Sequence, residues 1–224
     1  MISFRLMQAV VSVALIAASP AVAGTIRGTI HTPALADRAA PAGNGYPGSA
    51  ATMPGMRAMA RGLASDAVVY ITHLPAEVDS AIAVPPARPR LAQQGQAFVP
   101  RVLAVAVGTE VDFPNMDPIY HNVFSLSPVR RFDLGKYPRG HSKTVKFNHT
   151  GLVNVYCDIH SDMAAFVLVL QNHAFAQPGA DGTYALPELP AGRYELKVWH
   201  PDLSEVTRVV EVVDRGVTTV DVSF

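Results

Sequence analysis

The sequence has no surplus of charge of either sign: 18 lysine and arginine side chains balance 18 aspartate and glutamate side chains. Proteins whose main partner is nucleic acid cluster basic residues that neutralise phosphates. Here the one adjacent basic pair, Arg130-Arg131, is followed closely by Asp133. The sequence therefore predicts that nucleic acid is not a partner.

Long hydrophobic runs are scarce, and one lies near the beginning of the chain, over residues 9–18. Arg5 supplies a positive charge before it, and Ala21-Val22-Ala23 supplies the small side chains that a signal peptidase accepts after it. Because a helix needs about 20 apolar residues to span a bilayer, this run is short for a membrane anchor. We expect a secretory signal over residues 1–23, a periplasmic or otherwise exported protein, and no membrane span after cleavage.

Cysteine is almost missing: Cys157 is the only one in the chain, which excludes an internal disulfide. An exposed free thiol is a liability in an exported protein. Four roles are therefore open to Cys157: a buried and inert thiol, a disulfide with another chain, a nucleophile or a metal ligand. The residues next to it in the sequence distinguish among these roles.

Segments rich in β-branched and aromatic residues alternate with turns that contain glycine, proline or asparagine from residue 91 onward. The segments that we expect to be strands here are 97–107, 109–113, 123–126, 144–147, 152–157 and 164–170. Such short strands at close spacing predict an antiparallel sandwich or barrel, and hence an all-β fold.

The rest of the chain is expected to hold an insertion and a second β unit. Residues 31–66 are dominated by alanine, proline and glycine, which predicts a connecting insertion. Further strand patterns follow near the C-terminus, over residues 182–186, 193–199, 208–213 and 218–224. Together they predict a small β module of about 50 residues that packs on its neighbour.

The chemistry is concentrated in the segment from Cys157 to Met163, which reads C-x-x-H-x-x-M with His160 in its middle. His121 opens a predicted strand upstream. One thiolate, two imidazoles and a thioether are the donor set of a blue-copper site. Zinc is the main alternative metal, but its structural sites prefer several thiolates and its catalytic sites prefer histidine and carboxylate. A cysteine nucleophile with a histidine base is a further alternative.

Three segments together resemble the plastocyanin/azurin-type cupredoxins, and the ligand loop is most similar to that of amicyanin. They are Phe113-Pro114-Asn115, His121-Asn122-Val123 and the loop from Cys157 to Met163. The resemblance covers about residues 91–171 and implies a Greek-key sandwich around one mononuclear copper that cycles between Cu(I) and Cu(II). It implies ligands at His121, Cys157, His160 and Met163. It also implies that Asn122 steadies the ligand loop and that the ring of His160 reaches the surface as the exit for the electron.

The C-terminal strands carry a second resemblance. Gly182-Thr183-Tyr184 and residues 189–194 are similar to the transthyretin-like regulatory module found beside carboxypeptidases. The expected organisation is therefore a signal peptide over 1–23, a cupredoxin domain over 24–172 with its insertion at about 31–66, and a transthyretin-like β-sandwich module over 173–224.

The implied function is that of an exported electron carrier, not an enzyme, that moves single electrons between a donor and an acceptor protein. Copper storage or delivery through the same ligands is the alternative, to which Met53, Met56 and Met59 would contribute Cu(I)-binding sulfurs. A metal site that has become purely structural is a third possibility.

Overall fold

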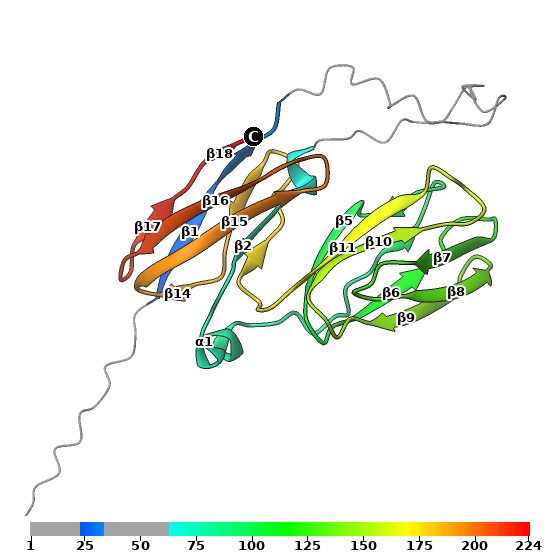
Figure 1. Ribbon diagram of the computed structural model, residues 1–224, viewed down its shortest axis with the longest axis horizontal. Helices are drawn as coiled ribbons and strands as arrows, with labels where there is room; N and C mark the ends of the chain where they lie inside the picture. The colour runs from blue at the N-terminus through cyan, green and yellow to red at the C-terminus, as the bar shows by residue number, and fades with distance from the viewer. Residues whose placement is uncertain (1–22, 34–62) are drawn as a thin grey trace, which may run out of the picture.

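The computed structural model describes residues 23–33 and 63–224 (Figure 1). Over these residues the chain is built almost wholly of strands, with one α-helix, α1 (Ala76–Ala81), and one 3-10 helix, η1 (Ala64–Asp66). The predicted all-β class is confirmed. Most of the predicted signal and insertion, together with the methionines at 53, 56 and 59, lies outside the described residues. No described helix is long and apolar enough to cross a membrane.

The middle of the chain forms a β-sandwich. Its larger sheet has the strand order β5-β11-β10-β7-β8, in which β5 and β11 run parallel and the other neighbours antiparallel. These strands are β5 (Val102–Ala106), β7 (His121–Ser125), β8 (Phe132–Tyr137), β10 (Gly151–Tyr156) and β11 (Ala164–Leu170). The other strands of this part are β3 (Ala92–Gln93), β4 (Phe98–Val99), β6 (Glu110–Pro114) and β9 (Ser142–Lys146), paired as β3-β4 and β6-β9.

One buried hydrophobic cluster fills this sandwich, with side chains from both groups of strands. It includes Phe113 and Val145 from β6 and β9, and Val153 and Val167 from β10 and β11. Alternate residues of each strand point inward, as a sheet with one buried face requires. Cys157 belongs to the same cluster, so the candidate site is anchored in the core of the sandwich.

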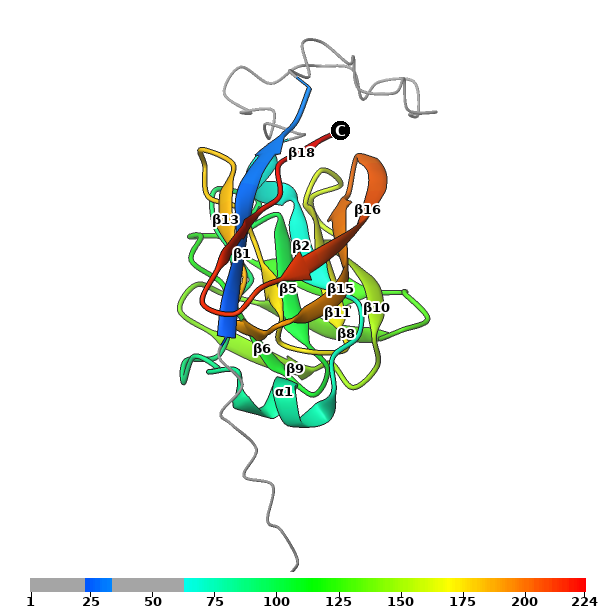
Figure 2. The same ribbon diagram turned by 90° about the vertical axis from the view of Figure 1, so that its left-hand side faces the viewer.

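A second unit contains two further sheets, which enclose a separate core (Figure 2). In the first sheet, β1 (Ala23–His31) pairs with β13 (Thr183–Ala185), β14 (Leu189–Pro190), β17 (Val217–Thr219) and β18 (Val222–Ser223). The second sheet has the order β12-β2-β15-β16, made of β12 (Phe175–Ala176), β2 (Val68–Ile71), β15 (Gly192–His200) and β16 (Leu203–Val212).

The strand pairings differ from the predicted division of the chain at residue 172. That division assigns the first two strands, β1 and β2, to the domain predicted over 24–172, whereas both pair with strands of the C-terminal segment. The pairing is tight, because the carbonyl of Val220 leaves no room for a Cβ atom at Gly28. Each strand lies more than 100 residues from most of its partners, so local sequence patterns contain no sign of this closure.

The two units meet along the face of β5 and β11 that is turned away from the core of the sandwich. A third buried cluster lies there, formed by Val68, Val102, Ala104, Leu168 and Leu170. The rings of Phe166 and Trp199 pack edge to face beside it at 6.1 Å. Arg101 closes the junction: its guanidinium lies 2.8 Å from the Asp66 carboxylate and 3.0 Å from that of Asp202.

Replacing Arg101 with methionine is expected to lower the free energy of unfolding by roughly 3 kcal/mol. The change leaves the buried Asp66 carboxylate without its cation, and removing one partner of a buried ion pair has costs of this order. Urea unfolding followed by the fluorescence of Trp199, the single tryptophan, measures the effect. Arg88→Met is the matched control, because Arg88 pairs with Glu110 at the surface and its loss should cost less than about 1 kcal/mol. Equal losses in the two variants would contradict the role assigned to Arg101.

Candidate metal centre

The candidate ligands lie where two adjacent antiparallel strands place their ends side by side. His121 is the first residue of β7, and Cys157 follows the last residue of β10, its neighbour in the sheet. The turn between β10 and β11 holds His160 and ends at Met163. Two backbone hydrogen bonds close this turn: Cys157 N–H donates to the Met163 carbonyl and Met163 N–H donates to the His160 carbonyl.

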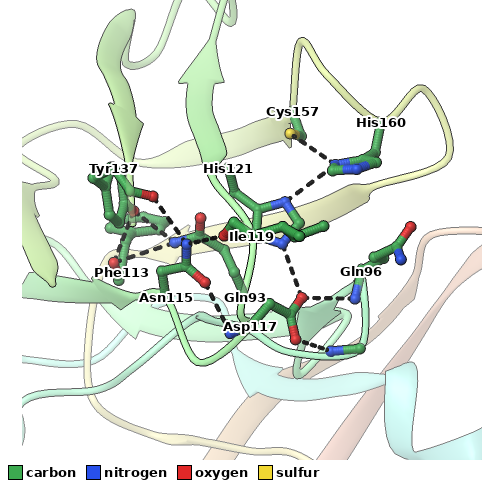
Figure 3. Close-up of polar contacts among 11 residues, drawn as sticks. Gln93, Gln96, Phe113, Asn115, Asp117, Ile119, His121, Tyr137, Cys157 and His160 are labelled. Atoms are coloured by element: carbon green, nitrogen blue, oxygen red, sulfur yellow. Dashed lines mark hydrogen bonds and ion pairs between the residues drawn. The ribbon is translucent and has the colours of Figure 1, made fainter. Parts of the chain in front are cut away.

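Three of the four predicted ligands converge in space (Figure 3). The Nδ1 atoms of His121 and His160 are 3.1 Å apart, and the Cys157 sulfur lies 3.8 Å from Nδ1 of His160. The donor atoms of all three residues lie within 4.8 Å of one another. His121 and Cys157 are buried and His160 is half-buried. Met163 is buried in the same hydrophobic cluster as Cys157.

These spacings fit one metal ion bound by all three residues. Two imidazole nitrogens at about 2.0–2.1 Å from an ion, with near-tetrahedral angles, are roughly 3.3 Å apart, and a nitrogen and a thiolate sulfur are roughly 3.5 Å apart. The observed 3.1 and 3.8 Å bracket those separations. One thiolate and two imidazoles beside a thioether match the donor preferences of copper, whereas structural zinc sites usually have more thiolates.

The outer nitrogen of His121 is held by a buried carboxylate. Its Nε2 lies 2.8 Å from Oδ2 of Asp117. Because a carboxylate only accepts hydrogen bonds, Nε2 carries the proton and Nδ1 keeps its lone pair for a metal. Burial on its own would raise the pKa of Asp117, but the N–H groups of Gln96 and Gly95 and the His121 ring outweigh it, so that the pKa is lowered and the group stays ionised.

The surroundings of His160 favour its neutral form. Burial, and then the proximity of His121, lower the pKa of the His160 ring below its ordinary value, which favours the neutral imidazole. The two rings are tilted by 57° with centroids 4.8 Å apart. Both rings therefore direct Nδ1 toward the space beside the cysteine sulfur, where a metal ion would take the place of the proton that the two nitrogens share at 3.1 Å.

Asn115 fixes the loop that precedes His121. Its Nδ2 donates to the carbonyls of Ile119 and Tyr137, both at 2.9 Å, and its Oδ1 accepts from Asp117 N–H at 2.9 Å. The side chain is fully buried. One amide thus ties three backbone groups together and sets the position of the loop that contains Asp117.

Asn115→Ala is expected to destabilise the metal-free protein by roughly 2–4 kcal/mol, because three backbone hydrogen bonds, two of them buried, are lost at once. Urea unfolding monitored by circular dichroism measures this loss. Asn148→Ala removes the same amide from an exposed position and should change the stability by less than about 0.5 kcal/mol. A similar small effect at Asn115 would show that its bonds do not organise the loop.

The predicted supporting residue, Asn122, has a different attachment. Its Nδ2 donates to Oδ1 of Asp133 at 2.7 Å, which ties β7 to β8, and its buried Oδ1 has no hydrogen-bond partner among the described residues. A steadying role in the ligand loop stays a prediction for this residue.

Three buried polar residues near the site were not found from the sequence: Asp117, Gln93 and Tyr137. Gln93 Nε2 donates to the Tyr137 hydroxyl at 2.6 Å, and that hydroxyl donates to the Phe113 carbonyl at 2.8 Å. Burial raises the pKa of Tyr137, so it remains a neutral donor. Asp117 stands four residues before His121, and that spacing was the one available signal. Gln93 lies on a separate hairpin, and no feature of the sequence connects it with the site.

Comparisons with known proteins give partial structural likenesses. No protein-family model and no curated protein sequence matches the chain. A copper-containing nitrite reductase from Thermus scotoductus SA-01 is 25% identical over 40% of this chain, with a TM-score of 0.37, and the match spans 24% of the reductase.

Two small cupredoxins are also similar to part of the chain. A purple cupredoxin from Nitrosopumilus maritimus is 22% identical over 36% of this chain and 98% of its own, with a TM-score of 0.34. An amicyanin variant in its oxidised state is 20% identical over 38% of this chain and 85% of its own, with a TM-score of 0.36. Each of these likenesses covers less than half of the chain.

Proposed function

We propose that the chain is a type 1 copper protein of the cupredoxin class that carries single electrons between redox partners. His121, Cys157, His160 and Met163 would hold one copper ion. The observation that supports this most is the convergence of two imidazole nitrogens and one thiol sulfur at spacings suited to a single ion. When bound, the copper would supply a one-electron change between Cu(II) and Cu(I).

The residues around the site favour electron transfer without rearrangement of the ligand side chains. His121 is held from behind by Asp117, and the turn from Cys157 to Met163 is closed by its own backbone hydrogen bonds. Cys157 and Met163 are packed in the core. Ligands fixed in this way cannot move far when the charge of the ion changes, and small movement keeps the barrier to electron transfer low.

The electron would leave through His160, whose ring is partly exposed. The two loops beside the ligands present apolar side chains to solvent, among them Met116 at 46%, Tyr120 at 59% and Ile159 at 42% exposure. The second β unit packs on the β5 and β11 face and leaves these side chains open. A donor and an acceptor protein could therefore approach the His160 edge.

Export to the periplasm or beyond is part of the proposal. It is supported by the signal pattern over residues 1–23 and by the position of the single cysteine beside two histidines, where it need not be a free thiol. The role is that of a carrier with no substrate to transform. Storage or delivery would draw on Met53, Met56 and Met59, which lie outside the described residues.

Visible absorption, electron paramagnetic resonance and voltammetry of the full protein loaded with one equivalent of Cu(II) test this function. An intense blue or green band, a narrow copper hyperfine splitting and a reversible one-electron wave are expected. A pale spectrum with wide splitting, or copper that dissociates on reduction, would contradict it.

A further inference from the structure

The carboxylate of Asp117 lies beside the candidate ligand His121 and accepts hydrogen bonds at both of its oxygens. Oδ1 of Asp117 accepts from Gly95 N–H at 2.6 Å, and Oδ2 accepts from Gln96 N–H at 2.8 Å and from Nε2 of His121 at 2.8 Å. Asp117 N–H in turn donates to Asn115. The group is 7% exposed, so its charge is poorly screened by water.

The two backbone donors come from the tip of the β3-β4 hairpin. Gly95 and Gln96 both have left-handed backbone angles, with φ of 64° and 58°. Gln94 N–H donates to the Ala97 carbonyl across the same turn at 2.9 Å. This two-residue turn points successive N–H groups at a single carboxylate, an arrangement that binds anions well. The hairpin therefore fixes Asp117 in its charged form opposite the ring of His121.

We propose that Asp117 is a positioning residue that locks His121 in the tautomer protonated at Nε2 and biases the site toward Cu(II) over Cu(I). The proposal rests on the copper site proposed above. A hydrogen-bonded carboxylate makes the imidazole a stronger electron donor and keeps its Nδ1 lone pair directed at the metal. A buried negative charge also interacts more favourably with a doubly than with a singly charged ion. Both effects lower the reduction potential.

An asparagine at position 117 cannot reproduce this arrangement. It has a single oxygen, whereas Gly95, Gln96 and His121 require acceptors at both positions. With its oxygen toward Gly95, the amide nitrogen faces His121 Nε2, so the ring loses both its acceptor and the adjacent negative charge that favours Cu(II). With its oxygen toward His121, the amide nitrogen faces the Gly95 N–H and the turn must shift.

The test measures the affinities of the full protein for Cu(II) and for Cu(I) separately, by competition with chelators, in wild type and Asp117→Asn. The Cu(II) affinity is expected to fall about 10–100-fold in the variant, in line with the loss of other residues that support a metal ligand. The Cu(I) affinity should fall at least tenfold less. Each factor of ten between the two losses equals a rise of about 59 mV in reduction potential.

Asp133→Asn is the matched control. It removes the same charge from a carboxylate whose partners are Asn122 and Gly135 instead of His121, and it should change both affinities by less than about threefold. Equal losses of Cu(II) and Cu(I) affinity in Asp117→Asn, or losses matched by the control, would overturn the inference.

Nitrogen NMR of the His121 ring in the metal-free protein gives a second readout that needs neither copper nor a variant that folds. The wild-type ring should be protonated at Nε2, and a ring protonated at Nδ1 would also overturn the inference. Failure of the proposed function is distinguishable: wild type would then lack the thiolate-to-copper band altogether, whereas failure of the Asp117 proposal leaves that band in place.

Discussion

Cys157→Ser is expected to abolish the intense visible absorption of the Cu(II)-loaded protein and to weaken copper binding by more than about 100-fold. The band arises from charge transfer from the thiolate sulfur, and a serine hydroxyl is neither ionised at neutral pH nor a comparable donor. Loss of a residue that only supports a ligand costs about 10–100-fold in affinity, and loss of a ligand should exceed that. Titration with Cu(II) followed by absorption spectroscopy measures both quantities.

Ser161→Ala provides the matched control, because it changes an exposed side chain of the same turn and leaves the sulfur in place. Its spectrum should equal that of wild type. An intense band that survives in Cys157→Ser would mean that the colour has another origin, and the assignment of the site would then be wrong.

Bound copper is expected to stabilise the folded protein by about 4 kcal/mol when the free metal is held at a thousand times its dissociation constant. The ligands come from one end of β7 and from the turn between β10 and β11, so the metal binds a site that exists only when these strands are paired. Urea unfolding with and without buffered Cu(I), followed by circular dichroism, measures the difference.

His121→Ala should remove most of this stabilisation, since the ligand from β7 is lost. His149→Ala should retain it, because His149 is an exposed residue outside the His121, Cys157 and His160 cluster. A shift of equal size in both variants would show that copper stabilises the protein through some other site.

The convergence of His121, Cys157 and His160 could be predicted because it depends on local features of the chain. Cys157 and His160 share one short turn, and the strand that begins at His121 pairs with the strand that precedes the turn. The turn residues and the alternating pattern of the strands are both visible in the sequence. The all-β class followed from the same alternation.

The supporting residues and the strand partners depend on distant parts of the chain, so they could not be predicted. The carboxylate of Asp117 acquires its role from the hairpin turn at Gly95 and Gln96, about 20 residues upstream. The first strand, which contains Gly28, finds its partners near Val220 at the other end of the chain. A strand pattern specifies a buried face but does not identify which strand will cover it.

X-ray absorption spectroscopy of the copper-loaded protein in its oxidised and reduced forms tests the central claim most directly. We expect one short copper–sulfur bond and two copper–nitrogen bonds in both forms, with little change between them, because Asp117 holds His121 and backbone hydrogen bonds close the turn that contains Cys157 and His160. Loss of the sulfur ligand in either form, or replacement of a nitrogen ligand on reduction, would contradict it.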